Sequence, residues 1–116
     1  MTILPKKDIL QLRSTKNKYQ GGKRMGTMIN PADVPKIKLY NGAEIPCVGM
    51  GTFGSDRFTA EQVSNAVAGA IRCGYRMFDC AACYGNEDQI GEVFKNAFDE
   101  GVVKRDDLVI MTKVWN

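Results

Sequence analysis

The fold is decided by residues 74–91, Gly-Tyr-Arg-Met-Phe-Asp-Cys-Ala-Ala-Cys-Tyr-Gly-Asn-Glu-Asp-Gln-Ile-Gly. An apolar segment predicts a strand that ends at Asp79, and a loop of small residues then carries Tyr84 up to a predicted helix start at Asn86. Catalytic groups of α/β folds collect where strands end and the following helices begin. Asp79 and Tyr84 are therefore candidate site residues, and an acid with a purely structural role at the strand end is the alternative.

Both flanks of this stretch predict helices. Upstream, Thr59 is the expected N-cap with Gln62 at the third helical position, which is the pattern of a capping box. The apolar residues that follow recur at the spacing of one helix face: Val63, Ala66, Val67, Ala70 and Ile71. Downstream, Asn86 is the expected N-cap of a second helix. Its apolar stripe consists of Ile90, Val93, Phe94, Ala97 and Phe98.

Further strand patterns place these helices in a larger order. Residues 37–40 and 44–46 predict a hairpin around Asn41-Gly42. Pro46 places that hairpin at an edge or end of the fold, because proline cannot donate to a ladder. Three further strands are predicted at residues 47–51, 75–79 and 108–112. The order is hairpin, then β-α-β-α-β, which is typical of an α/β fold with a parallel sheet and right-handed crossovers.

Parallel strands bring their carboxyl ends to one rim of the sheet. Asp79 ends one predicted strand and Lys113 follows the next, so their side chains should meet there, close to Tyr84 and the glycine-rich turn of residues 51–54. A phenol with its ordinary pKa of about 10 is a poor acid at neutral pH, but a nearby ammonium favours the phenolate and lowers that pKa. Tyr84 could then pass a proton to an oxygen that becomes an alkoxide, as a carbonyl does on receiving hydride. The structural alternative is a buried Asp79–Lys113 ion pair with Tyr84 packed over it.

The composition limits the chemistry that is available. The chain of 116 residues has no histidine, which removes Ser/His and Cys/His catalytic arrangements and all mixed Cys/His zinc sites. It lacks the apolar runs of a signal peptide or a membrane span. Cytoplasmic residence is expected, with the four cysteines as thiols. We predict no metal site, no membrane partner and no nucleic-acid partner.

Charge is divided unevenly along the chain. Residues 1–36 hold eight Lys and Arg against two acids, whereas residues 37–116 hold eight against eleven. The basic residues of the first part lack helical periodicity, and Gly21-Gly22 would break a helix. We therefore expect residues 1–35 to be a poorly ordered basic leader and residues 36–116 to form the folded domain. A nucleic-acid or membrane-surface arm is the alternative, which the scarcity of aromatic residues disfavours.

Five separated motifs resemble one family. Residues 74–81, followed by Tyr84-Gly85-Asn86-Glu87 and Ile90-Gly91, resemble the amino-terminal motif of the aldo-keto reductases. Three further segments also resemble this family, in the same order and spacing: the hairpin segment 42–46, the turn 49–53 and the closing segment 112–116. The resemblance runs from about residue 36 to residue 116 and does not cover the leader.

The resemblance implies the amino-terminal part of a TIM (β/α)8 barrel that uses NADPH to reduce an aldehyde or ketone, a small-molecule carbonyl substrate. Within it Tyr84 would be the proton donor, Lys113 the residue that lowers its pKa, and Asp79 the partner of that lysine. Cofactor contacts would come from Gly51, Thr52, Phe53 and Asp79. An apolar substrate pocket would be lined by Phe53, Cys83 and Trp115.

Departures from the family limit this expectation. The family's catalytic histidine has no counterpart here, and a full barrel needs about 250 residues and eight strands, of which three are predicted. Two sheet edges would stay open, and the inner face of the strands would be uncovered. We therefore expect the isolated chain neither to bind NADPH tightly nor to show detectable activity.

Two further hypotheses compete with a working reductase. The first is an inactive truncated or split-gene product that is unstable, or that completes itself only with another polypeptide as its partner. The second is thiol-redox or metal chemistry at Cys80-Ala81-Ala82-Cys83. That geometry is poor, because Tyr84 and Gly85 separate Cys83 from the helix start that would have to lower a thiol pKa.

Overall fold

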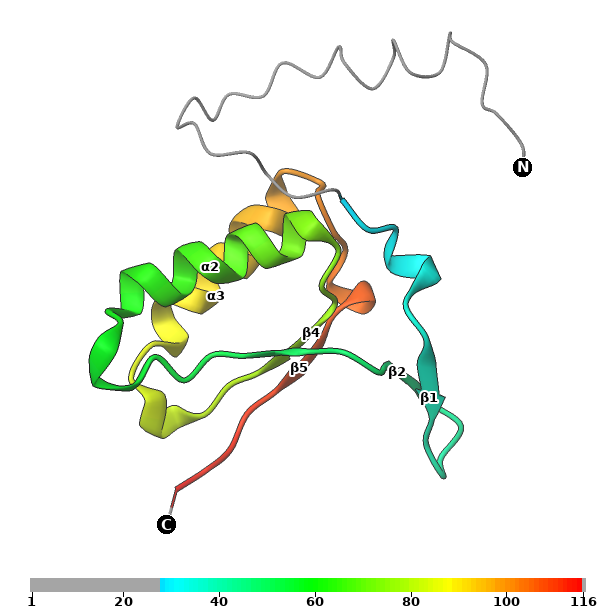
Figure 1. Cartoon of the computed structure of the whole chain (residues 1–116), viewed down its shortest axis with the longest axis horizontal. Helices are drawn as coiled ribbons and strands as arrows, with labels where there is room; N and C mark the ends of the chain where they lie inside the picture. Colours follow the sequence, from blue (N-terminus) through cyan, green and yellow to red (C-terminus); the bar gives the residue numbers. More distant parts are fainter. Residues whose placement is uncertain (1–27, 116) are drawn as a thin grey trace, which may run out of the picture.

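The computed structural model describes residues 28–115, drawn in colour in Figure 1. Most of the predicted leader, residues 1–27, lies outside the described residues, as does Asn116 at the end of the closing motif. The remaining leader residues, 28–35, include a 3-10 turn at Pro31–Asp33 that begins where the Asn30 side chain accepts a hydrogen bond from the Ala32 N–H. The division into a leader and a domain stays a prediction.

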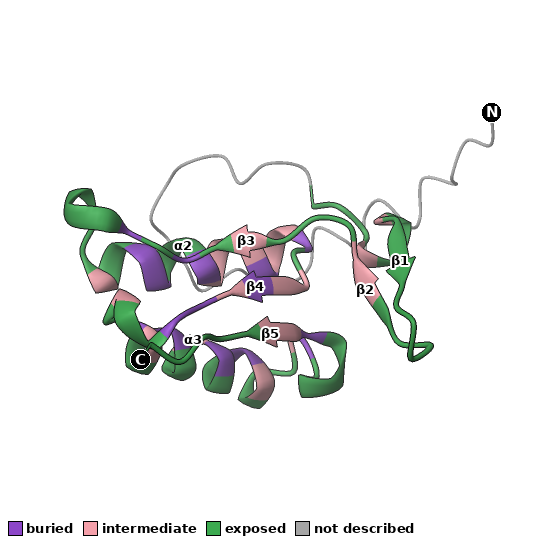
Figure 2. Cartoon of the chain, turned by 90° about the horizontal axis from the view of Figure 1, so that it is seen from below, coloured by how far each residue is buried: buried purple, intermediate pink, exposed green. Residues whose placement is uncertain are grey.

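The predicted hairpin forms a small antiparallel sheet of its own. Strand β1 (Lys36–Lys38) pairs with β2 (Glu44–Pro46), and Ile37 lies opposite Ile45. Gly42 has a φ of 87°, which glycine adopts without strain, and the turn closes where the Leu39 N–H donates to the Ala43 carbonyl. Figures 1 and 2 show the hairpin projecting at one end of the molecule, as Pro46 predicts.

A second sheet contains the three parallel strands. Strand β4 (Met77–Asp79) lies between β3 (Met50–Gly51) and β5 (Val109–Met111), so the predicted topology is confirmed. In register, Asp79 lies opposite Gly51 on one side and Met111 on the other. All three strands are shorter than predicted. Before β4, for example, the Tyr75 N–H donates to the Ala70 carbonyl and so belongs to the end of the preceding helix.

Helix α2 (Ala60–Cys73) begins and ends as its sequence predicts. The Thr59 hydroxyl accepts from the Gln62 N–H and the Gln62 side chain accepts from the Thr59 N–H, so the capping box is complete. Gly74 ends the helix at a φ of 109°. It also lies against the segment before the hairpin: the Ile29 N–H donates to the Cys73 carbonyl, and a Cβ on Gly74 would lie 2.5 Å from the Ile29 oxygen.

Helix α3 (Glu87–Asp99) departs from the prediction at its first residue. Asn86 occupies the N-cap position, but its side chain caps no helical N–H. The prediction of a side-chain cap is therefore wrong, because the Asn86 amide is engaged by a distant part of the chain. Short 3-10 turns complete the connections, at Ser55–Arg57, Ala82–Tyr84 and Arg105–Asp107. No helix within residues 28–115 has the length and apolar character needed to cross a membrane.

The core lies between the helices and one face of the three-stranded sheet. Phe78 in the middle of β4 is fully buried, and its ring meets that of Phe94 on α3 edge-on, with centroids 5.3 Å apart. The buried residues around this pair come from both helices and from the chain next to β4 and β5: Val63, Val67, Ile71, Cys80, Ile90, Ala97, Val103 and Leu108. Figure 2 shows this burial following the sides of α2 and α3 that meet the strands.

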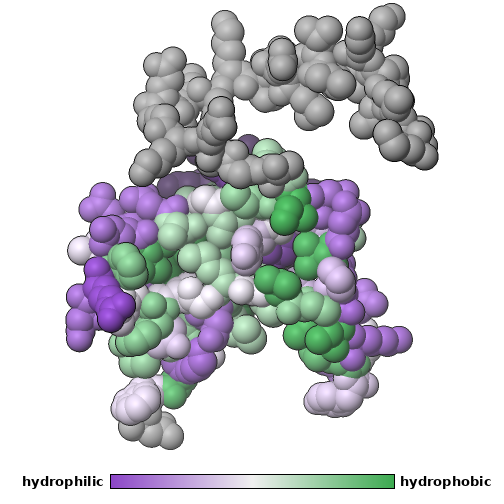
Figure 3. Space-filling view, viewed as in Figure 1, coloured by the Kyte–Doolittle hydropathy of each residue, from purple (hydrophilic) through white to green (hydrophobic). Residues whose placement is uncertain are grey.

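The opposite face of the sheet has no helix over it within the described residues. Alternation along β4 turns Met77 and Asp79 away from Phe78, and both are only partly buried. Met111 on β5 is 40% exposed. Figure 2 looks onto this face from below, whereas Figure 3 shows the molecule from the side, with hydrophobic residues over the middle of that view and hydrophilic ones toward its margins.

Candidate active site

A carboxylate, an ammonium and a phenol meet at the carboxyl ends of the parallel strands. Asp79 is the last residue of β4, and Lys113 follows β5 by two residues. Tyr84 ends the 3-10 turn after β4. The backbone continues this register beyond the strands, since the Cys80 N–H donates to the Met111 carbonyl and the Ala82 N–H to the Lys113 carbonyl. Parallel pairing thus brings residues 34 positions apart into contact.

Lys113 is held by two acceptors on β4 and its continuation. Its Nζ donates to the Asp79 carboxylate in an ion pair and to the Cys80 carbonyl at 2.8 Å. The hydrogen bond that Lys113 donates to Asp79 raises the pKa of Lys113 above its ordinary 10.5. The Lys113 side chain is 52% exposed and that of Asp79 41%, so the buried ion pair of the structural alternative is not what forms.

Tyr84 is close to this ammonium and to an aromatic ring. Lys113 Nζ lies 5.3 Å from the centroid of the Tyr84 ring, and the centroid of Phe53 lies 5.0 Å from it at an interplanar angle of 46°. Gly85 follows with a φ of 65°, which turns the chain toward α3. Tyr84 is partly buried, so its phenol is within reach of a reactant at the rim.

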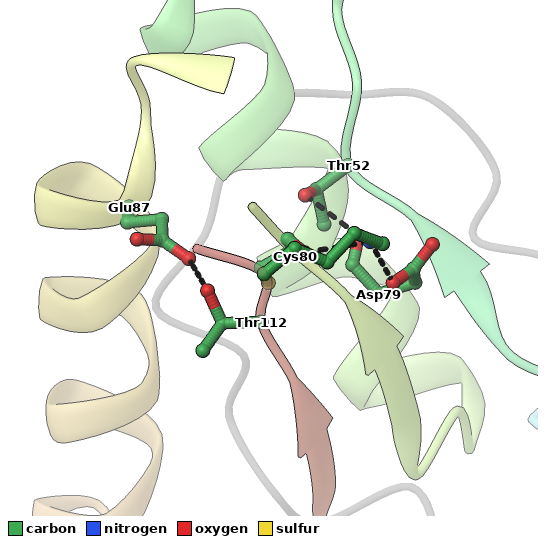
Figure 4. A network of polar contacts seen from close by, with 6 residues as sticks. Thr52, Asp79, Cys80, Glu87 and Thr112 are labelled. Atoms are coloured by element: carbon green, nitrogen blue, oxygen red, sulfur yellow. Dashed lines mark hydrogen bonds and ion pairs between the residues drawn. The ribbon is translucent and has the colours of Figure 1, made fainter. Parts of the chain in front are cut away.

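The predicted cofactor residues occupy different environments. Gly51 is exposed, and a Cβ built on it meets no atom within 4 Å, so open space lies beside it. Thr52 is 1% exposed, and its N–H and hydroxyl both donate to the Asp79 carbonyl at 3.0 Å. Thr52 therefore has no free donor, whereas Phe53 next to it is 66% exposed. Figure 4 shows Thr52 beside Asp79 and Cys80.

The predicted substrate pocket is not enclosed by the described residues. Trp115 is 79% exposed and Phe53 is 66% exposed, and Cys83 is also on the surface. An apolar hollow of about 280 Å³ does exist, but it lies at the amino ends of the strands. It is lined by Ile29, Val34, Pro46, Val48, Tyr75 and Arg76, among others.

Sequence reasoning missed the role of two polar contacts near the site. The Thr112 hydroxyl donates to the Glu87 carboxylate at 2.5 Å and so ties the chain before Lys113 to the first turn of α3 (Figure 4). The Asn86 side chain donates to the Thr52 carbonyl at 2.8 Å. Neither partner could be read from local spacing, because the two pairs are 25 and 34 residues apart.

The cysteines offer poor redox geometry. All four are free thiols, and Cys80 is 3% exposed. Burial raises the pKa of Cys80, whereas a reactive dithiol needs a lowered one. Among residues 28–115, no group of three or more Cys, Asp or Glu side chains is placed to hold a metal ion.

Comparison with known proteins agrees with this geometry. Residues 47–116 match the model of the aldo/keto reductase family. A D-galacturonate reductase from Hypocrea jecorina is 51% identical over 79 residues, which is 68% of this chain and 24% of that protein. An NADH-dependent D-xylose reductase from Candida parapsilosis is 46% identical over 82 residues, which is 71% of this chain and 24% of that protein.

A solved structure of an aldo-keto reductase is also similar to this chain. The crystal structure of an aldo-keto reductase from Bombyx mori in complex with NADP matches with a TM-score of 0.66 at 38% identity, over 72% of this chain and 28% of that one. The chain thus spans about a quarter of the length of the curated relatives it matches. Three parallel strands with their two helices are the corresponding part of a TIM barrel. The chain belongs to the aldo/keto reductase family.

Proposed function

We propose that residues 36–116 supply the proton-transfer part of an NADPH-dependent active site that reduces an aldehyde or ketone to an alcohol. The observation that carries this proposal is the ion pair of Lys113 with Asp79, 5.3 Å from the ring of Tyr84 at the rim of three parallel strands. The family membership supports it, as do the names of the relatives, which are reductases of sugars and sugar acids.

The described residues fit one end of the cofactor. Gly51 leaves open space beside the exposed ring of Phe53 and the partly exposed carboxylate of Asp79, so these three would hold the nicotinamide. Phosphate groups fit poorly here, because the first turn of α3 carries Glu87 and Asp88, which would repel them. Tight binding of the cofactor therefore needs residues beyond those described.

The chemistry divides between the cofactor and this chain. Bound NADPH would supply the hydride for the carbonyl carbon. Tyr84 would donate its hydroxyl proton to the carbonyl oxygen as negative charge develops there. Lys113 would stabilise the phenolate left behind, because an ammonium attracts a neighbouring negative charge.

Asp79 has a supporting role in this scheme. Its carboxylate raises the pKa of Lys113, so the ammonium stays charged throughout the physiological range. The same carboxylate and the Cys80 carbonyl fix the Nζ position beside the Tyr84 ring. We also propose cytoplasmic residence, which fits the four free thiols.

A hybrid protein tests the proposal. Residues 36–116 replace the matched portion of the Bombyx mori relative, and NADPH oxidation is followed by absorbance with D-xylose, D-galacturonate and a simple aldehyde. We expect turnover, and a loss of about 100-fold or more in kcat for Tyr84→Phe, the usual size of a general-acid contribution. Tyr75→Phe is the matched control, since Tyr75 lies at the other end of β4 and should change nothing.

The competing hypotheses make different predictions. A split-gene product predicts an isolated chain without activity and turnover in the hybrid, which supplies the missing polypeptide, whereas turnover that survives Tyr84→Phe contradicts the role of that phenol. The isolated chain should neither enhance NADPH fluorescence nor turn over an aldehyde. A dithiol function predicts instead that the isolated chain carries a thiol of low pKa, which alkylation rates measured against pH would detect.

A further inference from the structure

Asn86 begins α3 without using its side chain for the helix. It has φ −135° and ψ 6°, and no helical N–H is bound by its amide oxygen. An asparagine that caps a helix typically stabilises it relative to alanine. This helix forgoes that contribution, although asparagine is one of the residue types best suited to give it.

The Asn86 amide instead reaches across to the segment after β3. Its Nδ2 donates to the Thr52 carbonyl at 2.8 Å, and both residues are almost fully buried, at 3% and 1% exposure. Its Oδ1 is buried without a hydrogen-bond partner among the described residues. A buried unpaired acceptor is destabilising, so the amide is kept in an orientation that serves its donor and not its acceptor.

Thr52 is also held from its other side. Its N–H and its hydroxyl both donate to the carbonyl of Asp79, each at 3.0 Å. One residue thus joins the end of β4, which carries the site carboxylate, to the start of α3. The hydrogen bonds of Thr52 with Asp79 and with Asn86 therefore hold Thr52 from two elements, and we call this set of contacts the clamp.

This clamp closes a short ring of contacts around the phenol. Thr52 precedes Phe53, whose ring lies 5.0 Å from that of Tyr84. Tyr84 precedes Asn86 by two residues, with Gly85 as the only connection between them. Because Phe53 is 66% exposed, burial does not fix its ring, and the backbone at Thr52 has to do so.

We propose that Asn86 is a positioning residue of the active site. By holding the Thr52 carbonyl, it sets the ring of Phe53 against the ring of Tyr84, which Lys113 also contacts. The positional claim stands on the geometry alone, and its consequence for catalysis rests on the proposed function, in which Tyr84 donates the proton.

The test uses the full 116-residue chain and two substitutions. Asn86→Ser keeps a residue that caps helices well but cannot reach Thr52, and Asn86→Asp keeps the shape but loses the donor. Two-dimensional NMR follows the nuclear Overhauser contact between the Phe53 and Tyr84 rings and the exchange protection of the Thr52 N–H. Asn65→Asp on the exposed side of α2 is the control for the change in charge.

We expect both Asn86 variants to lose the ring contact and the Thr52 protection, while Asn86→Ser melts at the temperature of the unmodified chain and Asn65→Asp keeps both signals. A ring contact that survives Asn86→Ser overturns the proposal, as does an unmodified chain that lacks the contact. If Asn86→Ser melts lower, Asn86→Gln, which retains the amide, should restore the contact, and its failure to do so would contradict the clamp.

The catalytic consequence is measured in the hybrid reductase described above. Displacement of a catalytic group by about 1 Å can cost up to about 100-fold in rate, so Asn86→Ser should lower kcat by about 10- to 100-fold and leave KM within about twofold. An unchanged kcat contradicts the positioning role in catalysis and leaves the proposed function standing. A hybrid without turnover contradicts the proposed function, while the NMR result still decides the clamp.

Discussion

The two faces of the three-stranded sheet are built from adjacent residues and behave in opposite ways. Phe78 points into the helices and is fully buried, whereas Asp79, the next residue, points away from them and pairs with a half-exposed lysine. The helix-covered face gathers its apolar residues from both helices and the flanking chain. The other face and its rim carry the charged and aromatic side chains of the candidate site.

Two adjacent residues thus serve different purposes: Phe78 contributes to the stability of the core, and Asp79 belongs to the candidate site. Successive side chains of a strand point to opposite faces of the sheet. One residue can therefore anchor the sheet in the core while its neighbour remains available to a reactant. The same alternation predicts that substitutions on the two faces will have effects of very different size. The following predictions test that contrast, beginning with the largest effect.

Phe78→Ala should unfold most of the chain. Loss of a buried phenylalanine costs about 3–5 kcal/mol, which is a large part of the roughly 5–15 kcal/mol that stabilises a typical domain. Urea unfolding followed by circular dichroism measures the change. Phe58→Ala is the control, because Phe58 is 59% exposed and should cost far less. Equal losses at the two positions would contradict the contrast between the faces.

Two glycines compare the faces directly. A Cβ on Gly54 would lie 2.8 Å from a methyl of Val63 in the core and 2.9 Å from the Phe58 carbonyl oxygen, which belongs to the backbone. A Cβ on Gly49 would lie 2.7 Å from the terminal methyl of Met77, a flexible side chain that can move aside, and 3.2 Å from the Met77 carbonyl oxygen. Gly54→Ala should therefore cost about 1–3 kcal/mol and Gly49→Ala clearly less. Urea midpoints rank them, and the reverse order would show that the uncovered face is tightly packed.

The two helix starts provide a smaller contrast. Thr59 caps α2 with its own hydroxyl, so Thr59→Ala should lower the free energy of unfolding by about 1 kcal/mol. Thr59→Ser keeps the hydroxyl and is the matched control. Asn86→Ser at α3 should not destabilise that helix, because the native side chain caps nothing. Because serine caps helices about as well as asparagine, a loss at Asn86→Ser would report the hydrogen bond to the Thr52 carbonyl and not a cap. Equal losses at Thr59→Ala and Thr59→Ser would contradict the cap at α2.

The smallest effect concerns the ion pair at the rim. Asp79 raises the pKa of Lys113 in the folded chain above its ordinary value of 10.5. The ion pair therefore stabilises the folded chain below pH 10.5. This stabilisation is lost as the pH rises through the raised pKa of Lys113 in the folded chain. In Asp79→Asn the urea midpoint should fall less above pH 10.5 than it does in the unmodified chain. Asp99→Asn tests the separate contribution of Lys95, whose pKa is raised in the same way. An alkaline fall identical in Asp79→Asn and the unmodified chain would contradict the pairing.

The architecture was largely predictable because it depends on local patterns. The capping box at Thr59, the turn at Asn41-Gly42 and the alternation of strands and helices each specify their own element. The meeting of Asp79 with Lys113 followed from parallel topology alone, since the ends of neighbouring strands share a rim.

The unpredicted features all depend on contacts between distant segments. Local pattern favours Asn86 as a cap, because nothing nearby in the sequence reveals that a carbonyl 34 residues away will bind its amide. The two hydrogen bonds from Thr52 to the Asp79 carbonyl also join distant segments, and the cofactor contact of Thr52 stays a prediction. The strands were predicted too long, because residues at their starts bond elsewhere: Tyr75 to the end of α2, Leu108 to the turn before β5, and Cys47 to Pro35.

The order β3-β4-β5 leaves the outer edge of β5 without a strand partner within residues 28–115. An open edge of this kind pairs with whichever strand is present at the highest local concentration. A strand linked to this edge by a short flexible connection is present at an effective concentration on the order of millimolar. Free copies of the chain would therefore compete with such a linked strand for the edge of β5 only when the concentration of the chain itself approaches the order of millimolar.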